Sequence, residues 1–587
     1  MQPYKQPINI IGTDATFHGS LTVKPLQEGI SLVFIQIEAN QKAHPPIIRV
    51  EWSHPAVDIH AMWHPGNARN KNLQVDWDGR FQSKSTTLAP ITTLYNLNGQ
   101  NRLTFACSDA LSPITVKAGI HEEDSTFLCS ITFFEEPMPK IDKYEAVLRI
   151  DTRDIPYYES IRDVQAWWET FPGLEPAYVP EIALKPMYST WYSFHQALDA
   201  RAVEDQCKLA KSLGCEAVIV DDGWQTDDNN RGYAYTGDWE VAPKKMGDMR
   251  AHVDAVHQHG MQYLLWYSVP FVGNKSRVWK RFENKFLYSI ESLETNVLDP
   301  RFPDVREYLI GLYTAAVRDW GIDGLKLDFV DSFSLSKDKR DELGGGRDYD
   351  SVPEAVDRLL TDAMLQLRAI KPDILIEFRQ SYIGPLMRKY GNIFRASDCP
   401  NDAIDNRIRT LDLRLMSGNT AVHADMIMFN PAEPVESAAM QLINVLFSVP
   451  QISVMLQEAD SPHMRMLRFW LAFCMEHQEV LLKGDLAPTQ PEMLYPLVKA
   501  SLPDKQVAVV YSQVVIPLVG APVEQLILVN GTYQDSIVVK MHEGWGLYSA
   551  DVRNCLGEQV CMETIELASG LHEIKVPKAG VVFLKRT

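Results

Sequence analysis

The stretch "GLKLDFVDSF", residues 324–333, places two opposite charges inside an apolar segment. Leu325 and Leu327 predict a buried strand, and Lys326 and Asp328 alternate with them. Side chains two positions apart on a strand share a face, so Lys326 and Asp328 point the same way, about 7 Å apart. A lysine so placed can bind a ligand hydroxyl and keep the neighbouring carboxylate ionised.

Polar and aromatic side chains also end six other apolar segments. In chain order they are Trp191 and Tyr192; Asp221, Asp222 and Trp224; Trp266 and Tyr267; Glu377, Arg379 and Gln380; Arg395 and Asp398; His423 and Asp425. If these segments are parallel strands of one barrel, their carboxyl ends meet at a single mouth. Carboxylates and lysine bind hydroxyls, and indole faces pack against the C–H side of a sugar ring, so the mouth suits a sugar.

Two of these carboxylates are the natural pair for breaking a glycosidic bond, which needs one on each side of the anomeric carbon. Lys326 favours the ionised form of Asp328, which makes Asp328 the candidate nucleophile. Asp398 lies in the loop "FRASDCPND", where we expect partial burial to raise its pKa toward that of a working acid.

Four motifs occur in a specific order: "MYSTWYSFHQ", "VDDGWQ", "GLKLDFVD" and "RASDCPNDAIDNR". In this order they resemble glycoside hydrolase family 36, and the chain looks like an α-galactosidase of that family. The resemblance implies a retaining, exo-acting enzyme with Asp328 as nucleophile and Asp398 as acid/base. It implies that the galactose subsite is formed by Asp221, Asp222 and Lys326, which hold hydroxyls, and by Trp191 and Trp266, which line it.

The sequence also departs from that family. Many members carry a Cys- and Gly-rich loop where this chain reads "EFRQSYIGP", and an Arg-Asn pair before the run that here reads "ETNVLDP". These positions read the sugar around its 2-position, so an α-N-acetylgalactosaminidase and a galactosyl transferase with the same site stay open as alternatives. Arg379, Gln380 and Arg395 either contact the sugar or support the residues that do, and His423 and Asp425 are expected to be packing partners.

Two further classes compete with a glycosidase. A metal-dependent barrel isomerase or lyase would use Asp221, Asp328 and Glu377 as oxygen ligands, with Lys326 as base. A catalytically silent carbohydrate-binding protein would not need the pair Asp328 and Asp398. No zinc-type spacing of Cys and His is found, so we expect neither a metal nor a cofactor.

A (β/α)8 barrel over residues 185–484 would position these side chains. Eight short apolar strands alternate there with helical stretches, and no Gly-rich turn follows the first strand, as a doubly wound sheet would require. The first helix is predicted from its cap Asp199, through Val203 and Cys207, to the stop Gly214. Short alternating strands predict an N-terminal β-sandwich over residues 1–150 and a small C-terminal β-sandwich over residues 485–587, with a packed connector at 151–184.

The whole chain of 587 residues is 45% hydrophobic and carries a formal net charge of -19. This charge disfavours nucleic acid and anionic lipid as partners and favours a neutral small or oligomeric ligand. The resemblance implies that this ligand is an α-galactoside, small or oligosaccharide. The first residues lack the basic start and apolar middle of a secretory signal, which predicts a cytoplasmic protein. The eight scattered cysteines are expected to be reduced, and the resemblance suggests a homo-oligomer.

Overall fold

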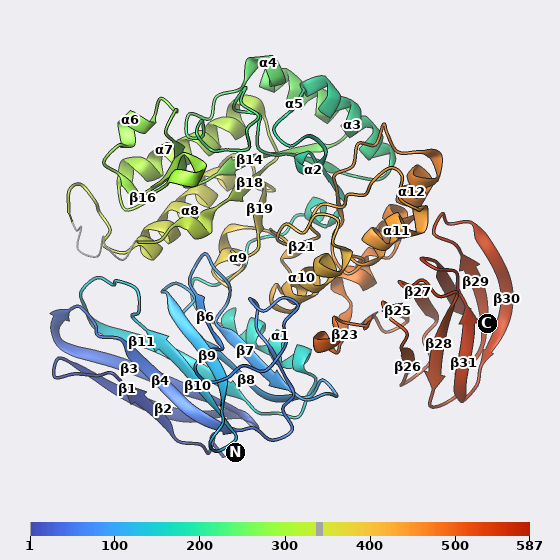
Figure 1. The fold of residues 1–587 in the computed structure, drawn as a ribbon, viewed down its shortest axis with the longest axis horizontal. Coiled ribbons are helices and arrows are strands. Elements are labelled where there is room, and N and C mark those ends of the chain that lie inside the picture. The colour runs from blue at the N-terminus through green and yellow to red at the C-terminus, as the bar shows by residue number, and fades with distance from the viewer. Residues whose placement is uncertain (1, 336–343) are drawn as a thin grey trace.

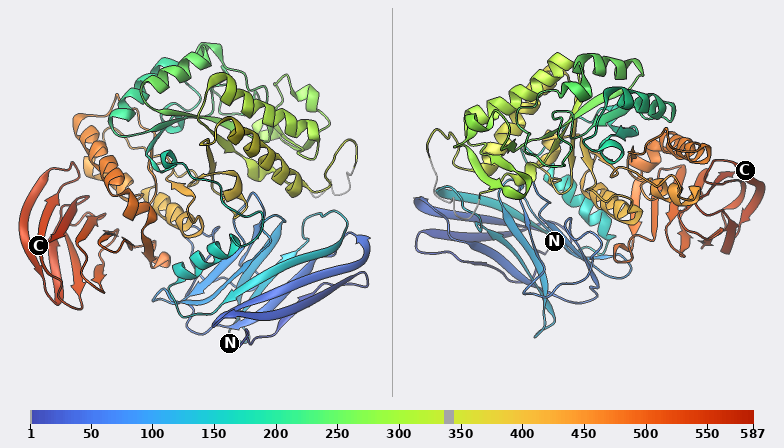
Figure 2. Two further views of the ribbon diagram at one scale, coloured as in Figure 1. Left: turned by 180° about the vertical axis from the view of Figure 1, so that it is seen from behind. Right: turned by 45° about the horizontal axis from the view of Figure 1, so that its top comes forward.

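The computed structural model describes residues 2–335 and 344–587. A central barrel is flanked by two all-β parts: N-terminal sheets below it and C-terminal sheets beside α11 and α12 (Figure 1). The views in Figure 2 show the same three-part arrangement from behind and with its top tilted forward. Within the described residues, no helix is long and apolar enough to cross a bilayer.

The barrel is built from the eight strands that the sequence predicts, all parallel. They are β12 (Met187–Ser189), β13 (Ala217–Val220), β14 (Gln262–Ser268), β18 (Gly324–Asp328), β19 (Leu375–Arg379), β20 (Ile393–Arg395), β21 (Ala421–His423) and β22 (Gln451–Ile452). The strands pair in the order β21-β20-β19-β18-β14-β13-β12-β22. β21 and the segment before β22 meet through a parallel bridge between His423 and Val449, so the barrel is nearly closed. The predicted fold class is therefore confirmed.

Helices follow the barrel strands in the alternation expected of this fold. They are α2 (Trp191–Phe194), α3 (Ala200–Ser212), α4 (Pro243–Met246), α5 (Met249–Gln258), α6 (Trp279–Phe282), α7 (Pro303–Ala315), α8 (Val352–Ile370), α9 (Met387–Tyr390), α10 (Ala403–Met416), α11 (Val435–Ile443) and α12 (Ser461–Glu476). The predicted first helix is α3: the Asp199 carboxylate accepts a hydrogen bond from the Ala202 N–H at 2.9 Å, and Gly214 takes a positive φ after the helix ends. Between β14 and β18 a small sheet is formed by β15 (Phe271–Gly273), β16 (Phe286–Ile290) and β17 (Thr295–Leu298).

The N-terminal part consists of two sheets that enclose a common apolar core. One contains β1 (Ile8–Ile11), β4 (Ile48–Pro55), β10 (Thr126–Phe133), β9 (Ile114–His121) and β6 (Arg80–Ser83). The other contains β2 (Phe17–Gln27), β3 (Ile30–Ala43), β11 (Ile141–Asp151), β8 (Asn101–Cys107), β7 (Ile91–Tyr95) and β5 (Ala61–Trp63).

The C-terminal part is also a pair of sheets. The larger contains β23 (Asp485–Thr489), β24 (Leu497–Ser501), β25 (Lys505–Val510), β27 (Gln525–Asn530), β32 (Val581–Arg586), β29 (Gly546–Arg553) and β30 (Gln559–Leu567). The smaller contains β26 (Val515–Leu518), β28 (Ser536–Met541) and β31 (Gly570–Lys575). The limits of 150, 184 and 484 that we predict for the parts stay a prediction.

The connector between the first sheets and the barrel contains a helix that the sequence did not reveal, α1 (Tyr157–Trp168). Close by, the buried Asp412 of α10 joins all three parts. Its carboxylate accepts hydrogen bonds from the Trp63 indole and the Lys71 ammonium, each at 2.8 Å, and from the Tyr495 hydroxyl. The barrel is thereby fixed to both flanking parts.

Candidate active site

Lys326 pairs with Asp221 rather than with its neighbour on the strand. The Lys326 Nζ donates to the Asp221 Oδ2 at 2.6 Å, and the two side chains are only 5% and 4% exposed. Among the described residues, no hydrogen bond or ion pair joins Lys326 directly to Asp328. The alternation of the strand directs both side chains to the same face, but β13 brings Asp221 within reach of the lysine, and Asp328 finds another cation.

Asp328 ends β18 and is held by three donors on one oxygen. Its Oδ1 accepts hydrogen bonds from the Phe329 N–H at 2.9 Å, from the Arg379 Nε at 2.8 Å and from the Tyr382 hydroxyl. Among the described residues, the Oδ2 accepts a single hydrogen bond, from the Trp266 indole at 3.1 Å. The Oδ2 is therefore the oxygen with room to react.

The surroundings of Asp328 keep it ionised. Burial alone would raise its pKa, but the charges of Arg379 and Lys326 outweigh burial and hold the pKa well below its usual range. Hydrogen bonds from Tyr382 and Trp266 act in the same direction. The predicted effect of Lys326 on this carboxylate is thus present, but it acts through space and is secondary to Arg379.

Asp398 lies in the loop after β20 and is paired with Arg395. The Arg395 Nη2 donates to the Asp398 Oδ1 at 2.9 Å, while Nη1 of the same arginine donates to the Asp425 Oδ1. The Asp398 side chain remains 45% exposed. Asp425 is fixed in turn by the Tyr192 hydroxyl at 2.9 Å and the Cys399 N–H at 2.7 Å.

The expectation that Asp398 has a raised pKa is wrong. Its partial removal from water would raise the pKa, but the charges of Arg395, Lys326 and Arg379 outweigh this and lower it. Lys326 and Arg379 therefore lower the pKa of both Asp328 and Asp398, which places the two carboxylates around one group of cations.

Asp222 has the raised pKa that we expected of Asp398. Burial raises the pKa of Asp222 to about 6, although two amides donate to its carboxylate. The Gln196 Nε2 donates to its Oδ2 at 2.6 Å and the Gln225 Nε2 to its Oδ1 at 2.7 Å. The neighbouring Asp221 contributes to the rise through its negative charge.

The two tryptophans predicted to line the subsite differ in position. Trp191 is half-buried on α2, edge-on to His195. Trp266 is only 1% exposed, because Tyr233 stacks near its ring and Trp239 covers it edge-on. Trp266 reaches the site through its indole N–H, so it positions Asp328 and does not offer an open ring face.

Several of the predicted residues contact the surroundings of the two carboxylates and not the carboxylates themselves. The Gln380 Oε1 accepts the Ser397 N–H at 3.1 Å, which braces the loop that carries Asp398. His423 is buried and hydrogen-bonded to the Ala183 carbonyl at 2.7 Å, as expected of a packing partner. The Glu377 Oε2 accepts a hydrogen bond from the Gln451 amide.

The three carboxylates of the metal hypothesis have different protein partners. Asp221 is bonded to Lys326, Asp328 to Arg379, and Glu377 to Gln451. Over residues 2–335 and 344–587, no group of three His, Cys, Asp or Glu is placed to hold an ion.

Sequence reasoning missed Tyr382, Gln196 and Gln225, which contact the carboxylates directly. Each lies in a loop three or more residues beyond a barrel strand, outside the strand ends on which the prediction relied. Proximity in sequence was the signal: Tyr382 is three residues after Arg379, and Gln225 is three residues after Asp222.

The model of the Melibiase family matches residues 183–351, which contain Asp221, Asp222, Lys326 and Asp328. The bifunctional α-galactosidase/sucrose kinase AgaSK of Mediterraneibacter gnavus is 26% identical over 202 residues, which is 32% of this chain and 20% of that protein. α-Galactosidase Mel36A of Lactobacillus acidophilus is 27% identical over 191 residues, which is 30% of this chain and 25% of that protein. The aligned segments thus span a quarter or less of these curated relatives.

Solved structures share the fold over the whole chain. The GH36 α-galactosidase AgaA of Geobacillus stearothermophilus has a TM-score of 0.65 at 13% identity, with 100% of this chain and 87% of that chain covered. The galactosidase domain of AgaSK has a TM-score of 0.66 at 13% identity, with 97% and 80% covered. The chain is therefore similar in sequence to the Melibiase family over residues 183–351 and to these α-galactosidases over about a third of its length, and it shares the fold of solved GH36 α-galactosidases.

Proposed function

We propose that the protein is a retaining, exo-acting α-galactosidase. The observation that carries the proposal is the environment of Asp328: a buried carboxylate whose Oδ1 takes three donors while its Oδ2 takes one. A carboxylate held in one orientation, with a pKa well below its usual range, suits a nucleophile that must be ionised and aimed. An acid or base would not need such a low pKa.

In the first step the Asp328 Oδ2 attacks the anomeric carbon, and Asp398 gives a proton to the departing glycosidic oxygen. The product is a glycosyl ester on Asp328. In the second step Asp398 takes a proton from water, which attacks the same carbon and releases the sugar with its original configuration. The ion pair with Arg395 keeps Asp398 ionised and so favours the second step, while in the first step Asp398 must be protonated against that charge.

Asp221, Asp222 and Lys326 are proposed to bind the sugar hydroxyls. Lys326 and Asp221 are already bonded to each other, so each has a fixed direction and keeps further donor or acceptor capacity for a hydroxyl. Support comes from the Melibiase match, which includes all three residues. A cavity of about 150 Å³ is lined by Tyr192, whose hydroxyl donates to Asp425, and it is proposed to receive the leaving group.

An oligosaccharide α-galactoside is the proposed substrate. Variants of the Geobacillus AgaA have been solved in complex with raffinose and with stachyose. An α-N-acetylgalactosaminidase is the second candidate, because the A type blood α-D-galactosamine galactosaminidase of Flavonifractor plautii is 23% identical over 195 residues. A galactosyl transferase would share both steps and differ only in its acceptor. Cytoplasmic localisation and a homo-oligomeric state also remain proposals.

A panel of aryl α-glycosides that differ at carbons 2 and 4 tests the proposal. We expect release of the phenol from the α-galactoside, with α-galactose as the first sugar product seen by NMR. Faster turnover of the 2-acetamido substrate would favour the second candidate. A β-configured first product would rule out retention. Turnover of only those glycosides whose 4-hydroxyl is equatorial, such as the α-glucoside, would rule out galactose.

A further inference from the structure

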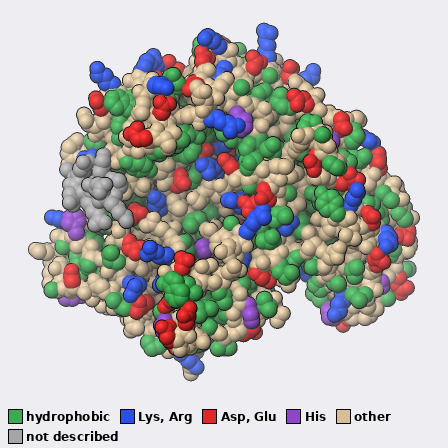
Figure 3. Space-filling view, in the orientation of Figure 1, with side chains coloured by type: hydrophobic (Ala, Val, Ile, Leu, Met, Phe, Trp, Pro, Cys, Tyr) green, Lys and Arg blue, Asp and Glu red, His purple; other side chains and the backbone are tan. Residues whose placement is uncertain are grey.

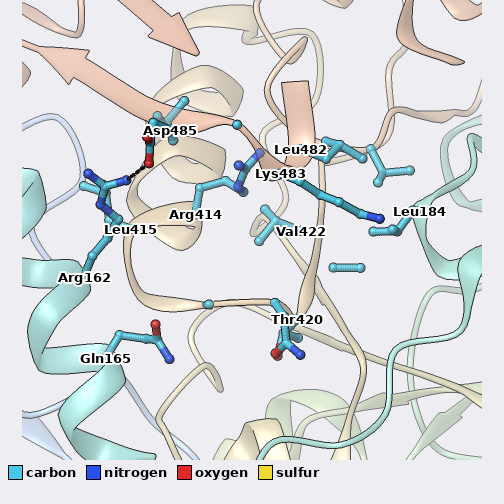
Figure 4. Close-up of a pocket in the computed structure, with 16 residues that line it drawn as sticks. Arg162, Gln165, Leu184, Arg414, Leu415, Thr420, Val422, Leu482, Lys483 and Asp485 are labelled. Atoms are coloured by element: carbon cyan, nitrogen blue, oxygen red, sulfur yellow. Dashed lines mark hydrogen bonds and ion pairs between the residues drawn. The ribbon is translucent and has the colours of Figure 1, made fainter. Parts of the chain in front are cut away.

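A cavity of about 380 Å³ lies at the end of the barrel opposite the mouth. It is enclosed by α1, by the residues that lead into β21, and by the short helical turn Glu479–Lys483 with the start of β23. Figure 4 shows Arg162 and Gln165 on α1 at the left of the cavity, and Arg414 and Thr420 to their right. None of the residues assigned to the active site lines this cavity.

Arg414 lines the cavity without a carboxylate partner. Its Nη1 donates to the backbone carbonyls of Phe447 and Leu481, so that nitrogen has a structural role. Over the described part of the chain, Nε and Nη2 form no hydrogen bond and no carboxylate pairs with the guanidinium. Burial and the nearby charge of Arg162 lower the pKa of Arg414 to about 10, as expected of a cation whose charge is not compensated.

Two other cations line the cavity, and only one acid does. The Arg162 Nη1 reaches the Asp485 Oδ1 at 3.4 Å, but the Asp485 side chain is 90% exposed, so this pair is weak. Lys483 has no ion-pair partner among the described residues. Three cations and one carboxylate give the lining a net charge of plus two, in a chain with a formal net charge of -19.

The excess of positive charge is local to the cavity lining. On the face in Figure 3, basic and acidic side chains are intermixed. A partly buried cation left without a counter-ion is costly, and a bound anion removes that cost.

We propose that this cavity binds a phosphorylated sugar. A phosphate monoester carries a charge of almost minus two on three acceptor oxygens, which balances the lining and suits the fork of a guanidinium. The remaining lining suits a sugar: the Gln165 Nε2 donates to Glu169 and the Asn419 Oδ1 accepts from Arg388, which leaves the Gln165 Oε1 and the Asn419 Nδ2 for hydroxyls. The apolar side of the ring can pack against Leu184 and Val422.

Calorimetric titration of the full chain with glucose 6-phosphate tests the proposal, with glucose, inorganic phosphate and malonate as comparison probes. We expect glucose 6-phosphate to bind more tightly than each of the other three. Lys483→Gln and Arg162→Gln should each weaken this binding by about tenfold, since each removes a charge-assisted contact. Turnover of aryl α-galactosides by Lys483→Gln should stay at the wild-type level.

Arg468→Gln is the matched control, because it removes an exposed positive charge on α12 that does not line the cavity. It should bind glucose 6-phosphate as the wild type does. Arg414→Gln should abolish binding; if it unfolds, the two other variants decide. Absence of heat at millimolar glucose 6-phosphate, equal binding of malonate, or equal weakening by Arg468→Gln would overturn the proposal. Equal affinity for inorganic phosphate would overturn its sugar part.

Discussion

At the scale of single residues, the orientation of Asp328 depends on donors that come from other strands and loops. Tyr382 and Arg379 both donate to its Oδ1, and Trp266 donates to its Oδ2. Within residues 2–335 and 344–587, the Tyr382 hydroxyl donates to no carboxylate other than that of Asp328. Its contribution to turnover can therefore be separated from that of the charges.

Tyr382→Phe should lower kcat by about 10- to 100-fold, because loss of one hydrogen bond to a charged group costs about 1.5–3 kcal/mol. The pKa of Asp328 should rise, since a donor to the ionised form is lost. Tyr390→Phe is the matched control: Tyr390 is also buried and donates to a carboxylate, that of Asp357, away from the mouth. Steady-state kinetics should show the loss only for Tyr382→Phe. An equal loss in both variants would mean that Tyr382 has no specific role at the site.

The ion pair of Lys326 and Asp221 leads to a different expectation. Lys326→Met leaves the buried Asp221 charge unpaired, which should lower the free energy of unfolding by about 3–5 kcal/mol and abolish turnover. The double variant with Asp221→Asn removes that charge and should recover most of the stability but no activity. Denaturant titration followed by an assay checks both. A stable Lys326→Met variant would show that the pair is not energetically coupled.

Asp222 sets the expected acid limb of the pH profile. Its pKa is raised to about 6, so kcat/KM should fall as the pH drops through that value if Asp222 must be ionised to bind a hydroxyl. Gln225→Met removes a donor that favours the ionised form, so the pKa should rise further and the limb should move up by about one pH unit. A limb that stays in place or moves down would exclude Asp222 as its origin.

At the scale of elements, α3 is held by the cap that the sequence predicted. Asp199→Ala removes the acceptor for the Ala202 N–H and should lower the free energy of unfolding by about 1 kcal/mol. Asp205→Ala, an exposed position on the same helix, should have no such cost. Denaturant titration of the two variants compares them directly. Equal effects would show that charge on the helix, and not the cap, is responsible.

The elements were largely predictable because their signals are local. Alternating apolar residues and turn residues located all eight barrel strands, and Gly214 marked the end of α3. The helix α1 was missed although Tyr157, Ile161, Val164 and Trp168 recur at helical spacing, because it lies in a proline-rich connector that we interpreted as irregular. In the C-terminal part, β30 is exposed along most of its length, so it lacks the apolar alternation on which strand prediction relies.

The partners within the site were less predictable because they depend on strand order. The sequence places Lys326 beside Asp328 on β18. In the barrel, β19 lies on one side of β18, and β13 lies two strands away on the other side. Asp221 follows β13 and bonds Lys326, and Arg379 of β19 bonds Asp328. The low pKa of Asp398 has a local cause in Arg395, three residues before it, but the further lowering by Lys326 and Arg379 depends on the neighbouring strands. Which cation meets which acid is a property of the assembled barrel.

At the scale of the whole molecule, buried polar contacts join the three parts of the chain. Asp412 links Trp63 and Lys71 of the N-terminal part to Tyr495 of the C-terminal part. The proposed anion cavity lies at the end of the barrel opposite the mouth, between α1 and β23. The N-terminal part also reaches the loops at the mouth: the Leu88 N–H donates to the Ser381 carbonyl at 2.7 Å, and Arg69 pairs with Asp402 at 2.5 Å. The parts are therefore joined at both ends of the barrel.

The assignment of Asp328 as nucleophile is the central claim, and a trapped intermediate tests it most directly. In Asp398→Ala the second step lacks its base, so an aryl α-galactoside with an acidic phenol should glycosylate the enzyme and leave the ester in place. Digestion and mass spectrometry should then find one hexosyl group on the peptide that contains residues 324–333, attached to Asp328. A hexosyl group on any other carboxylate, or a burst of phenol without any adduct, would contradict the account.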